Sequence, residues 1–294
     1  MKIHSKDQDR NMSKISRRTI LTSTVAAGVG AVLGESHNAG AQEATPLSAP
    51  HKKRDWCDKE FRTLVTLGES TTAGGWASYR ERAWAHQLHR TINEFQRVPV
   101  QLVNVGIGAN VISTRVPSYE FSGKPAALER LDPHVIRHKP DLLIVSYGLN
   151  DARGGTPLPL FLEEMVTLIE RVRANIQPLI VLLSPYYVTG FDQYGPHFNK
   201  ATLEIFHQFA DATRKLAGEK DCLFADVLSC YGNANWLIHH DTVHANDLGH
   251  RIVANKVFEV LATNCSCLAK ETQELEKQIP RWRDESVLQR DVKK

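Results

Sequence analysis

The chain has 294 residues, of which 42% are hydrophobic and 23% charged, and this length suits one large α/β domain or two small ones. Its formal net charge of +3 arises entirely from the first 41 residues, which hold six basic and three acidic side chains. The remaining residues carry no net charge, so the basic balance of the whole chain does not indicate a nucleic-acid partner, and we expect none.

The first 41 residues have the order of an export signal. A basic segment that includes Arg17 and Arg18 is followed by an uncharged stretch over residues 19–34 and by the small residues 39–41. The paired arginines favour the twin-arginine route to the periplasm or the cell exterior. The alternative is an N-terminal membrane anchor, but the apolar run is short and rich in Gly, Ala and Thr. We therefore expect export, cleavage and no stable association with a membrane.

From residue 61 onward, short apolar runs alternate with longer amphipathic segments. Five of the short runs predict strands, over residues 63–67, 100–105, 142–147, 179–184 and 222–227. Strands that alternate with helices in this way predict a parallel sheet with helices on both faces. Such a sheet binds its ligand at the carboxyl ends of the strands, so the functional residues are expected in the loops that follow them.

Four segments have apolar residues at helical spacing, and three of them have a defined inward face. In the first, this face consists of Trp84, Leu88, Ile92 and Phe95. In the second, it consists of Phe161, Met165, Leu168, Ile169 and Val172. The third helix is predicted over residues 199–217. The fourth follows Asp247, and its inward face consists of Leu248, Ile252, Val257 and Leu261.

Three predicted strands are followed by loops that hold candidate catalytic groups. Ser70 follows the first strand and is surrounded by small residues. This pattern is typical of an exposed nucleophilic serine, of a phosphate-binding turn and of an ordinary turn. Gly106 follows the second strand. Its backbone N–H could donate to an oxyanion, or the glycine could simply allow a tight loop. Asn150 follows the third, as a side-chain donor to an oxyanion or as a cap of the strand exit.

The segment before the last predicted helix holds three histidines and an aspartate. His244 suits a general base, and Asp241 suits the carboxylate that holds its imidazole in place. Together with His239 and His240, these residues also suit a zinc site. A third interpretation is a polar loop whose last residues cap the following helix.

Taken together, these four segments resemble the SGNH hydrolases, the GDSL-like lipases and esterases. The signature of that family is a serine in a Gly-Asp-Ser turn, a glycine, an asparagine in Gly-x-Asn-Asp and a histidine in Asp-x-x-His, in this order. The corresponding residues here are Ser70, Gly106, Asn150, and His244 with Asp241. The resemblance spans residues 61–262, which is nearly the whole predicted core.

The resemblance implies a flavodoxin-like three-layer α/β/α sandwich with a five-stranded parallel sheet. It also implies a carboxylic ester hydrolase that needs no metal and no cofactor, with Ser70 as nucleophile, His244 as base and Asp241 as its partner. The oxyanion hole would consist of Ser70, Gly106 and Asn150. Glu69 stands where the family usually has an aspartate, and we expect altered local hydrogen bonds there, with activity retained.

The substrates of the family range from acetylated sugars to lipids and thioesters. Aromatic residues near the predicted loops suit sugar rings, and ordinary packing explains any single one equally well. They are Trp76, Tyr79, Tyr186, Tyr187, Phe191, Tyr194 and Trp236. These aromatic residues and the predicted export together favour a small ester or an acetylated carbohydrate as the substrate. Two alternatives are a non-catalytic glycan-binding protein of this fold and a metal-dependent hydrolase that uses His239, His240, Asp241 and His244.

We expect the export signal over residues 1–41, a leader over 42–60, the hydrolase domain over 61–268 and a charged tail over 269–294. After export the cysteines would meet an oxidising compartment, which predicts one or two disulfides of undetermined pairing. The cysteines are Cys57, Cys222, Cys230, Cys265 and Cys267. A zinc site on the last two is less favoured, because their spacing is one residue shorter than the usual pair.

Overall fold

The computed structural model describes residues 53–192, 194–279 and 285–292. The expected export signal and most of the expected leader lie outside these residues, so both stay predictions. Within the described ranges, no single helix is long and apolar enough to span a membrane. Two consecutive helices that meet at a sharp bend, Asp247–Asn264 and Ser266–Glu276, are long and apolar enough only when they are taken together.

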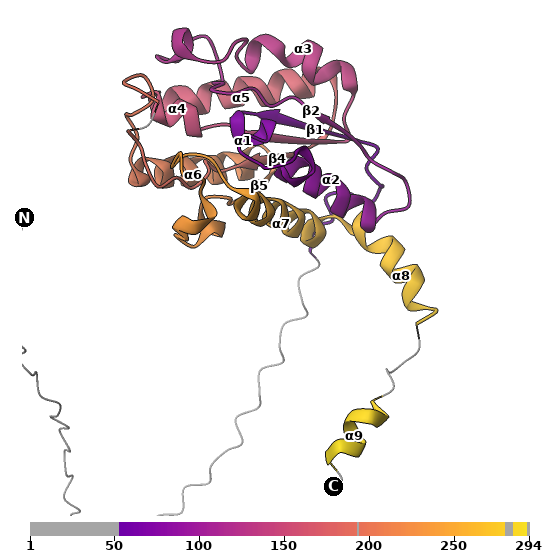
Figure 1. The fold of residues 1–294 in the computed structure, drawn as a ribbon. Coiled ribbons are helices and arrows are strands. Elements are labelled where there is room, and N and C mark those ends of the chain that lie inside the picture. Colours follow the sequence, from indigo (N-terminus) through magenta and orange to yellow (C-terminus); the bar gives the residue numbers. More distant parts are fainter. Residues whose placement is uncertain (1–52, 193, 280–284, 293–294) are drawn as a thin grey trace, which may run out of the picture. The chain divides into compact units, whose positions relative to one another are not determined.

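Five parallel strands form one sheet, and they coincide with the five apolar runs. They are β1 (Thr63–Gly68), β2 (Gln101–Asn104), β3 (Leu142–Ser146), β4 (Leu179–Leu183) and β5 (Leu223–Ala225). Their order across the sheet is β2-β1-β3-β4-β5 (Figure 1). This is the flavodoxin-like order, in which the chain changes direction across the sheet between β1 and β3 and a ligand binds at the carboxyl ends of those strands. The predicted fold is confirmed.

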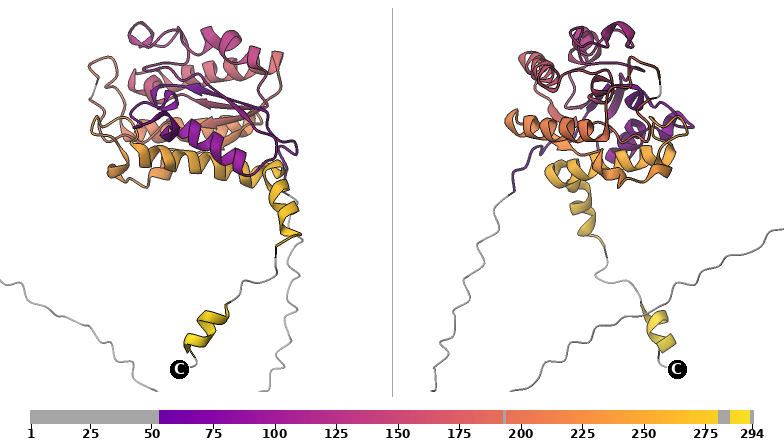
Figure 2. Two further views of the ribbon diagram at one scale, coloured as in Figure 1. Left: turned by 45° about the vertical axis from the view of Figure 1, so that its right-hand side comes forward. Right: turned by 90° about the vertical axis from the view of Figure 1, so that its left-hand side faces the viewer.

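Helices cover both faces of the sheet (Figures 1 and 2). On one face, α2 (Trp84–Glu94) packs against α7 (Asp247–Asn264). On the other lie α3 (Leu131–His134) and α5 (Leu158–Asn175), and α5 contacts α6 (Leu203–Glu219). Two short helices, α1 (Ser70–Ala73) and α4 (Leu149–Arg153), follow β1 and β3. The predicted tail contains α8 (Lys270–Glu276) and α9 (Ser286–Val292).

Two predicted core positions and one helix boundary are wrong. Phe95 is 37% exposed, because α2 ends at Glu94 and Phe95 is the residue that follows it. Leu248 is 54% exposed, because it lies on the outer side of the first turn of α7. The buried face of α7 consists of Gly249, His250, Val253, Ala254, Val257 and Leu261. Helix α6 begins at Leu203, since the side chain of Thr202 caps it.

All five cysteines are free thiols in the structure, so the expected disulfides are not formed. Cys57 and Cys267 nevertheless lie at adjoining positions, because the Cys267 N–H donates to the Cys57 carbonyl oxygen (3.1 Å). The Trp56 N–H likewise donates to the carbonyl oxygen of Asn264 (2.9 Å). These bonds hold the described part of the leader against the end of α7.

Candidate active site

Ser70 lies where β1 ends and α1 begins. Gly68, the last residue of β1, has no space for a side chain, since a Cβ there would lie 2.3 Å from Thr72 Oγ1 and 2.7 Å from the Ser146 carbonyl oxygen. The chain turns tightly at this point, and Ser70 becomes the first residue of α1. Its N–H therefore has no partner within the helix, and the residue lines a cavity.

His244 and Asp241 come from the loop before α7, which is closed by an antiparallel bridge between Ile238 and Ala245. His244 Nε2 lies 2.7 Å from Ser70 Oγ, and His244 Nδ1 lies 2.5 Å from Asp241 Oδ2. Asp241 Oδ1 also accepts the backbone N–H of His244 (3.0 Å), which fixes the carboxylate in its own loop. The structure thus joins the three predicted residues in one chain of hydrogen bonds.

The surroundings of His244 and Asp241 favour a neutral imidazole beside an ionised carboxylate. Burial lowers the pKa of His244 below its ordinary value of 6.5, and the Asp241 carboxylate opposes this shift. Burial raises the pKa of Asp241, but the hydrogen bonds from His244 and Tyr194 outweigh it and lower this pKa to about 2. At neutral pH, His244 can therefore accept a proton on the nitrogen that faces Ser70.

Tyr194 contacts the same carboxylate, a role that the sequence did not predict. Its hydroxyl donates to Asp241 Oδ2 (2.7 Å), the oxygen that also faces His244. Burial and the bond to Asp241 together raise the pKa of Tyr194 to about 12, so the hydroxyl stays protonated and able to donate. No motif marks this contact, because it joins two loops that lie 47 residues apart.

Gly106 does not supply the predicted oxyanion donor. Its N–H donates to Asn104 Oδ1 (3.0 Å), and the residue does not line the cavity beside Ser70. A glycine is required here for close packing instead, because a Cβ would lie 2.1 Å from the backbone nitrogen of Ala73 in α1. The assignment of Gly106 to the oxyanion hole is therefore wrong.

Three other groups are placed to bind an oxyanion. Gly108 and Ala109 line the cavity, and their N–H groups donate to no acceptor among the described residues. Ala109 has a φ of +53°, in the left-handed region, which turns the chain at this point. Asn150 lines the same cavity, and its Nδ2 donates to the Asn110 carbonyl oxygen (3.1 Å). An amide nitrogen carries two hydrogens, so the second one is available to a ligand.

Glu69 is buried behind Ser70 and ties two parts of the site together. Its Oε1 accepts the N–H groups of Gly148 (3.1 Å) and Asn150 (3.2 Å). Asp151 is also buried, and its Oδ2 accepts the same Gly148 N–H (3.2 Å). Burial raises the pKa of both carboxyls, and the nearby charge of Asp151 raises that of Glu69 further. Glu69 thus links the serine turn to the segment that carries Asn150.

Replacing Glu69 with glutamine is expected to flatten the pH dependence of stability. Because the folded state raises both carboxyl pKa values above their ordinary 4.5 and 3.8, it binds more protons than the unfolded chain, and its free energy of unfolding falls as pH rises. Glutamine keeps an acceptor oxygen for the two N–H groups and removes the proton that the Glu69 carboxyl binds in the folded state. Between about pH 5 and 8, Tm should therefore fall less steeply in Glu69→Gln than in the wild type.

Glu164→Gln is the matched control for this measurement. Glu164 is also buried, but it pairs with Arg115 at 2.5 Å, and Glu163, which shares that arginine, is exposed. Replacing Glu164 is expected to lower Tm at every pH and to leave the dependence of Tm on pH as steep as in the wild type. Equal slopes in Glu69→Gln and the wild type would contradict the prediction for Glu69.

The neighbouring histidines do not form a metal site with His244. In the described ranges, no group of three or more His, Cys, Asp or Glu side chains is arranged to hold a metal. Both nitrogens of His244 face other partners, and His239 stacks on Trp76 with ring centroids 4.6 Å apart. The geometry therefore gives no support to the metal interpretation of His239, His240, Asp241 and His244.

The cavity beside Ser70 has a volume of about 490 Å³ and an aromatic wall. Trp76, Phe121 and Tyr194 line it, and each is slightly more than half exposed. Trp76 and Tyr194 are two of the aromatic residues that the sequence suggested, whereas Phe121 was not. The other five do not line this cavity: Tyr79, Tyr186, Tyr187, Phe191 and Trp236.

The sequence matches known proteins over most of the domain that holds this site. Residues 66–252 match the GDSL-like lipase/acylhydrolase family. An acetylxylan esterase of Geobacillus stearothermophilus is 25% identical over 178 residues, which are 54% of this chain and 71% of that protein.

Solved structures share the fold at lower sequence identity. A lipase/acylhydrolase from Enterococcus faecalis has a TM-score of 0.56 and 17% identity, over 69% of this chain and 96% of its own. The acetylxylan esterase of G. stearothermophilus has a TM-score of 0.52 and 19% identity, over 68% and 94%. A two-domain esterase active on acetylated mannans has a TM-score of 0.51 and 19% identity, over 69% and 49%. The chain therefore belongs to the GDSL-like lipase/acylhydrolase family and is a carboxylic ester hydrolase.

Proposed function

We propose that this hydrolase removes acetyl groups from a polysaccharide outside the cytoplasm, through an acyl-enzyme on Ser70. The observation that carries the proposal is the hydrogen-bonded chain from Ser70 to His244 and Asp241, which opens on a cavity with an aromatic wall. A serine activated by a positioned imidazole is the arrangement that acyl transfer requires.

In the proposed mechanism, Ser70 Oγ attacks the ester carbonyl while His244 Nε2 takes the hydroxyl proton. Asp241 stabilises the resulting imidazolium. The tetrahedral oxyanion accepts hydrogen bonds from the Ser70 N–H, the Asn150 amide and the cavity-lining N–H groups of residues 108–109. His244 then protonates the leaving alcohol oxygen. A water molecule, deprotonated by His244, attacks the acyl-enzyme, and acetate leaves as Ser70 recovers its proton.

The aromatic wall of the cavity and two of the relatives named above support an acetylated sugar as the substrate. Half-exposed rings of Trp76, Phe121 and Tyr194 offer flat apolar faces on which a sugar ring can stack. The relatives include an acetylxylan esterase and an esterase active on acetylated mannans. We extend this substrate class, but no particular polymer, to the present chain.

The export that residues 1–41 predict supports the same substrate class, because acetylated polysaccharides lie outside the cytoplasm. The basic pair Arg17–Arg18 ahead of the uncharged stretch over residues 19–34 supports the twin-arginine route. Cell fractionation of the full chain tests it, with Arg17→Lys/Arg18→Lys as the variant that should stay in the cytoplasm. Equal amounts of both proteins outside the cytoplasm would contradict this route.

The substrate proposal is tested by measuring acetate released from acetylated xylan and acetylated mannan, beside p-nitrophenyl acetate and p-nitrophenyl octanoate. We expect release from at least one polymer and a preference for acetate over octanoate. Trp76→Ala should raise KM for acetylated oligosaccharides by about tenfold, as expected when one stacked ring is lost. Trp236→Ala, which removes an exposed Trp outside the cavity, is the control. Activity on p-nitrophenyl esters without release from any polymer contradicts the proposal.

A further inference from the structure

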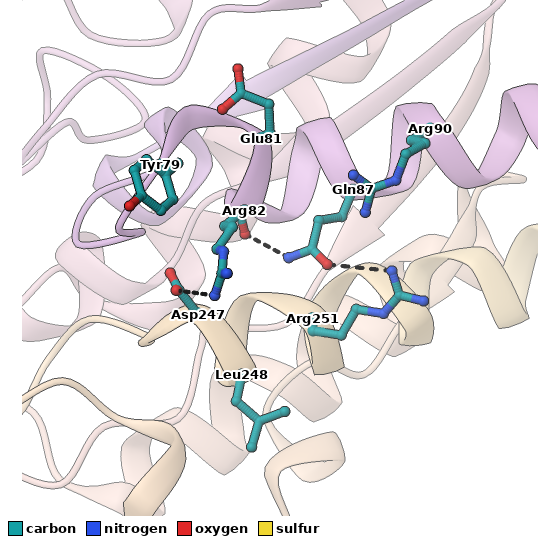
Figure 3. Close-up of a pocket in the computed structure, with 8 residues that line it drawn as sticks. All are labelled: Tyr79, Glu81, Arg82, Gln87, Arg90, Asp247, Leu248 and Arg251. Carbon is teal, nitrogen blue, oxygen red and sulfur yellow. Dashed lines mark hydrogen bonds and ion pairs between the residues drawn. The ribbon is translucent and has the colours of Figure 1, made fainter.

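A second cavity, of about 500 Å³, lies between α2 and α7 (Figure 3). We call it the arginine pocket. Its lining consists of Tyr79, Glu81, Arg82, Gln87, Arg90, Asp247, Leu248 and Arg251. The mechanism proposed above uses none of these residues.

The arginine pocket adjoins the active-site cavity along two segments of the chain. Gly75 and Trp76 line the active-site cavity, and Tyr79 lines the arginine pocket three residues later. In the same way, His244 lines the first cavity and Asp247 lines the second. A single loop on each side therefore separates the two, and one extended ligand can reach both.

The boundary between the cavities is held by a single carboxylate. Asp247 accepts the backbone N–H of Ser78 (2.8 Å) and its hydroxyl (2.6 Å). It also accepts a bond from the guanidinium of Arg82 (2.8 Å). These bonds fix the loop over residues 75–79 onto the start of α7. Within the described part of the chain, Asp247 pairs with Arg82 and makes no bond to Arg90 or Arg251.

Two guanidinium groups in the pocket have no acidic partner in the described part of the chain. Arg251 donates only to the side-chain oxygen of Gln87 (3.4 Å), which is a long bond to a neutral group. Arg90 makes no hydrogen bond or ion pair within the described ranges, and both side chains are exposed. In Figure 3 the carboxylate of Glu81 points away from the arginines. The pocket is thus left with two unneutralised cationic groups.

Alongside these charges, the pocket offers the contacts that a sugar requires. Tyr79 is 66% exposed and presents a ring beside Arg82, whose guanidinium carbon lies 5.7 Å from the ring centroid. Leu248 adds an exposed apolar surface. A pocket that offers an aromatic face at one end and two guanidinium groups at the other suits a sugar unit that carries a carboxylate, because guanidinium groups bind carboxylates through paired, charge-assisted hydrogen bonds.

Building on the proposed function, we propose that the arginine pocket binds a uronic acid residue of the same polysaccharide whose acetyl ester lies at Ser70. Arg90 and Arg251 bind its carboxylate, and Tyr79 contacts its ring. The pocket therefore selects acidic acetylated polysaccharides over neutral ones. The ester bond breaks at Ser70 as before, and the pocket contributes binding of the polymer alone.

The test compares acetylated xylooligosaccharides of equal length with and without a glucuronic acid substituent. The wild type should have a KM about tenfold lower for the acidic substrate, and added salt should reduce this preference. Arg90→Ala/Arg251→Ala should abolish the preference and leave kcat and the turnover of p-nitrophenyl acetate unchanged. Arg62→Ala/Arg137→Ala removes the same charge from exposed positions outside the pocket and should keep the preference.

Three results would overturn the inference, and they differ in what they say of the proposed function. Equal KM values of the wild type for both substrates overturn it and leave the deacetylase proposal intact. A preference that survives in Arg90→Ala/Arg251→Ala, or that Arg62→Ala/Arg137→Ala loses, shows that overall charge is responsible. No acetate release from either oligosaccharide or from acetylated mannan, with p-nitrophenyl acetate still cleaved, overturns both proposals together.

Discussion

Ser70→Ala is expected to reduce kcat for p-nitrophenyl acetate by at least about 10⁴-fold, because serine and imidazole act as a unit in acyl transfer. Ser70 Oγ is the hydroxyl placed 2.7 Å from His244 Nε2, and alanine leaves the imidazole with no nucleophile to activate. Residual turnover would then come from the oxyanion donors and substrate binding. The measurement is kcat of the purified variant, with circular dichroism to establish that it is folded.

Two further results complete the Ser70 experiment. Phenylmethylsulfonyl fluoride should inactivate the wild type and leave its adduct on the peptide that contains Ser70. Ser229→Ala, which changes an exposed serine far along the sequence, should retain activity and the adduct. Full activity in Ser70→Ala would falsify the serine mechanism, and loss of activity in a chelator would then revive the metal interpretation of the His239–His244 segment.

The sequence predicted the sheet and the residues of the hydrogen-bonded chain from Ser70 to Asp241 because both depend on short segments. Runs such as Leu142–Ser146 are buried on both sides and contain almost nothing but apolar residues, which is the pattern of a central parallel strand. Ser70 comes two residues after the end of one of these strands, and His244 comes two residues before the cap of a helix. Once the order of the strands is known, the carboxyl edge of the sheet is the place where such residues meet.

The features that the sequence did not predict depend on contacts between loops. Tyr194 reaches Asp241 across 47 residues, and the conformation of both loops decides the contact. The sequence points to Gly106 as one of three oxyanion donors, beside Ser70 and Asn150, because a glycine in a turn suggests an exposed N–H. The glycine is needed for packing against Ala73, while the exposed N–H groups belong to Gly108 and Ala109. Residue type alone does not distinguish these two uses of a turn.

Leu248 shows how apolar spacing can assign a residue to the wrong face of a helix. At about 100° per residue, positions 248 and 252 lie on the side of a helix opposite to positions 257 and 261. The buried face of α7 instead includes Val253, Val257 and Leu261. Leu248 points outward from the first turn of α7 and lies on the wall of the arginine pocket.

Asp241→Asn is expected to reduce kcat by about 10⁴-fold, nearly as much as the loss of the serine. The carboxylate accepts from His244 Nδ1, which keeps Nε2 free to take the proton of Ser70. An asparagine can present its NH₂ group to Nδ1, and this favours the tautomer whose Nε2 already carries a hydrogen and cannot act as a base.

Tyr194→Phe separates this orienting role from the charge itself. It removes one of the bonds to Asp241 Oδ2 but leaves the carboxylate and its bond to His244 in place. The loss of kcat should therefore stay within about 100-fold, because one hydrogen bond to a charged group is worth about 1.5 to 3 kcal/mol. Both variants are measured on p-nitrophenyl acetate. If Asp241 sets the tautomer of His244, kcat should fall much more in Asp241→Asn than in Tyr194→Phe. Similar losses in both would mean that Tyr194 holds His244 as firmly as the carboxylate does, and the base would then depend on the loop around residue 194.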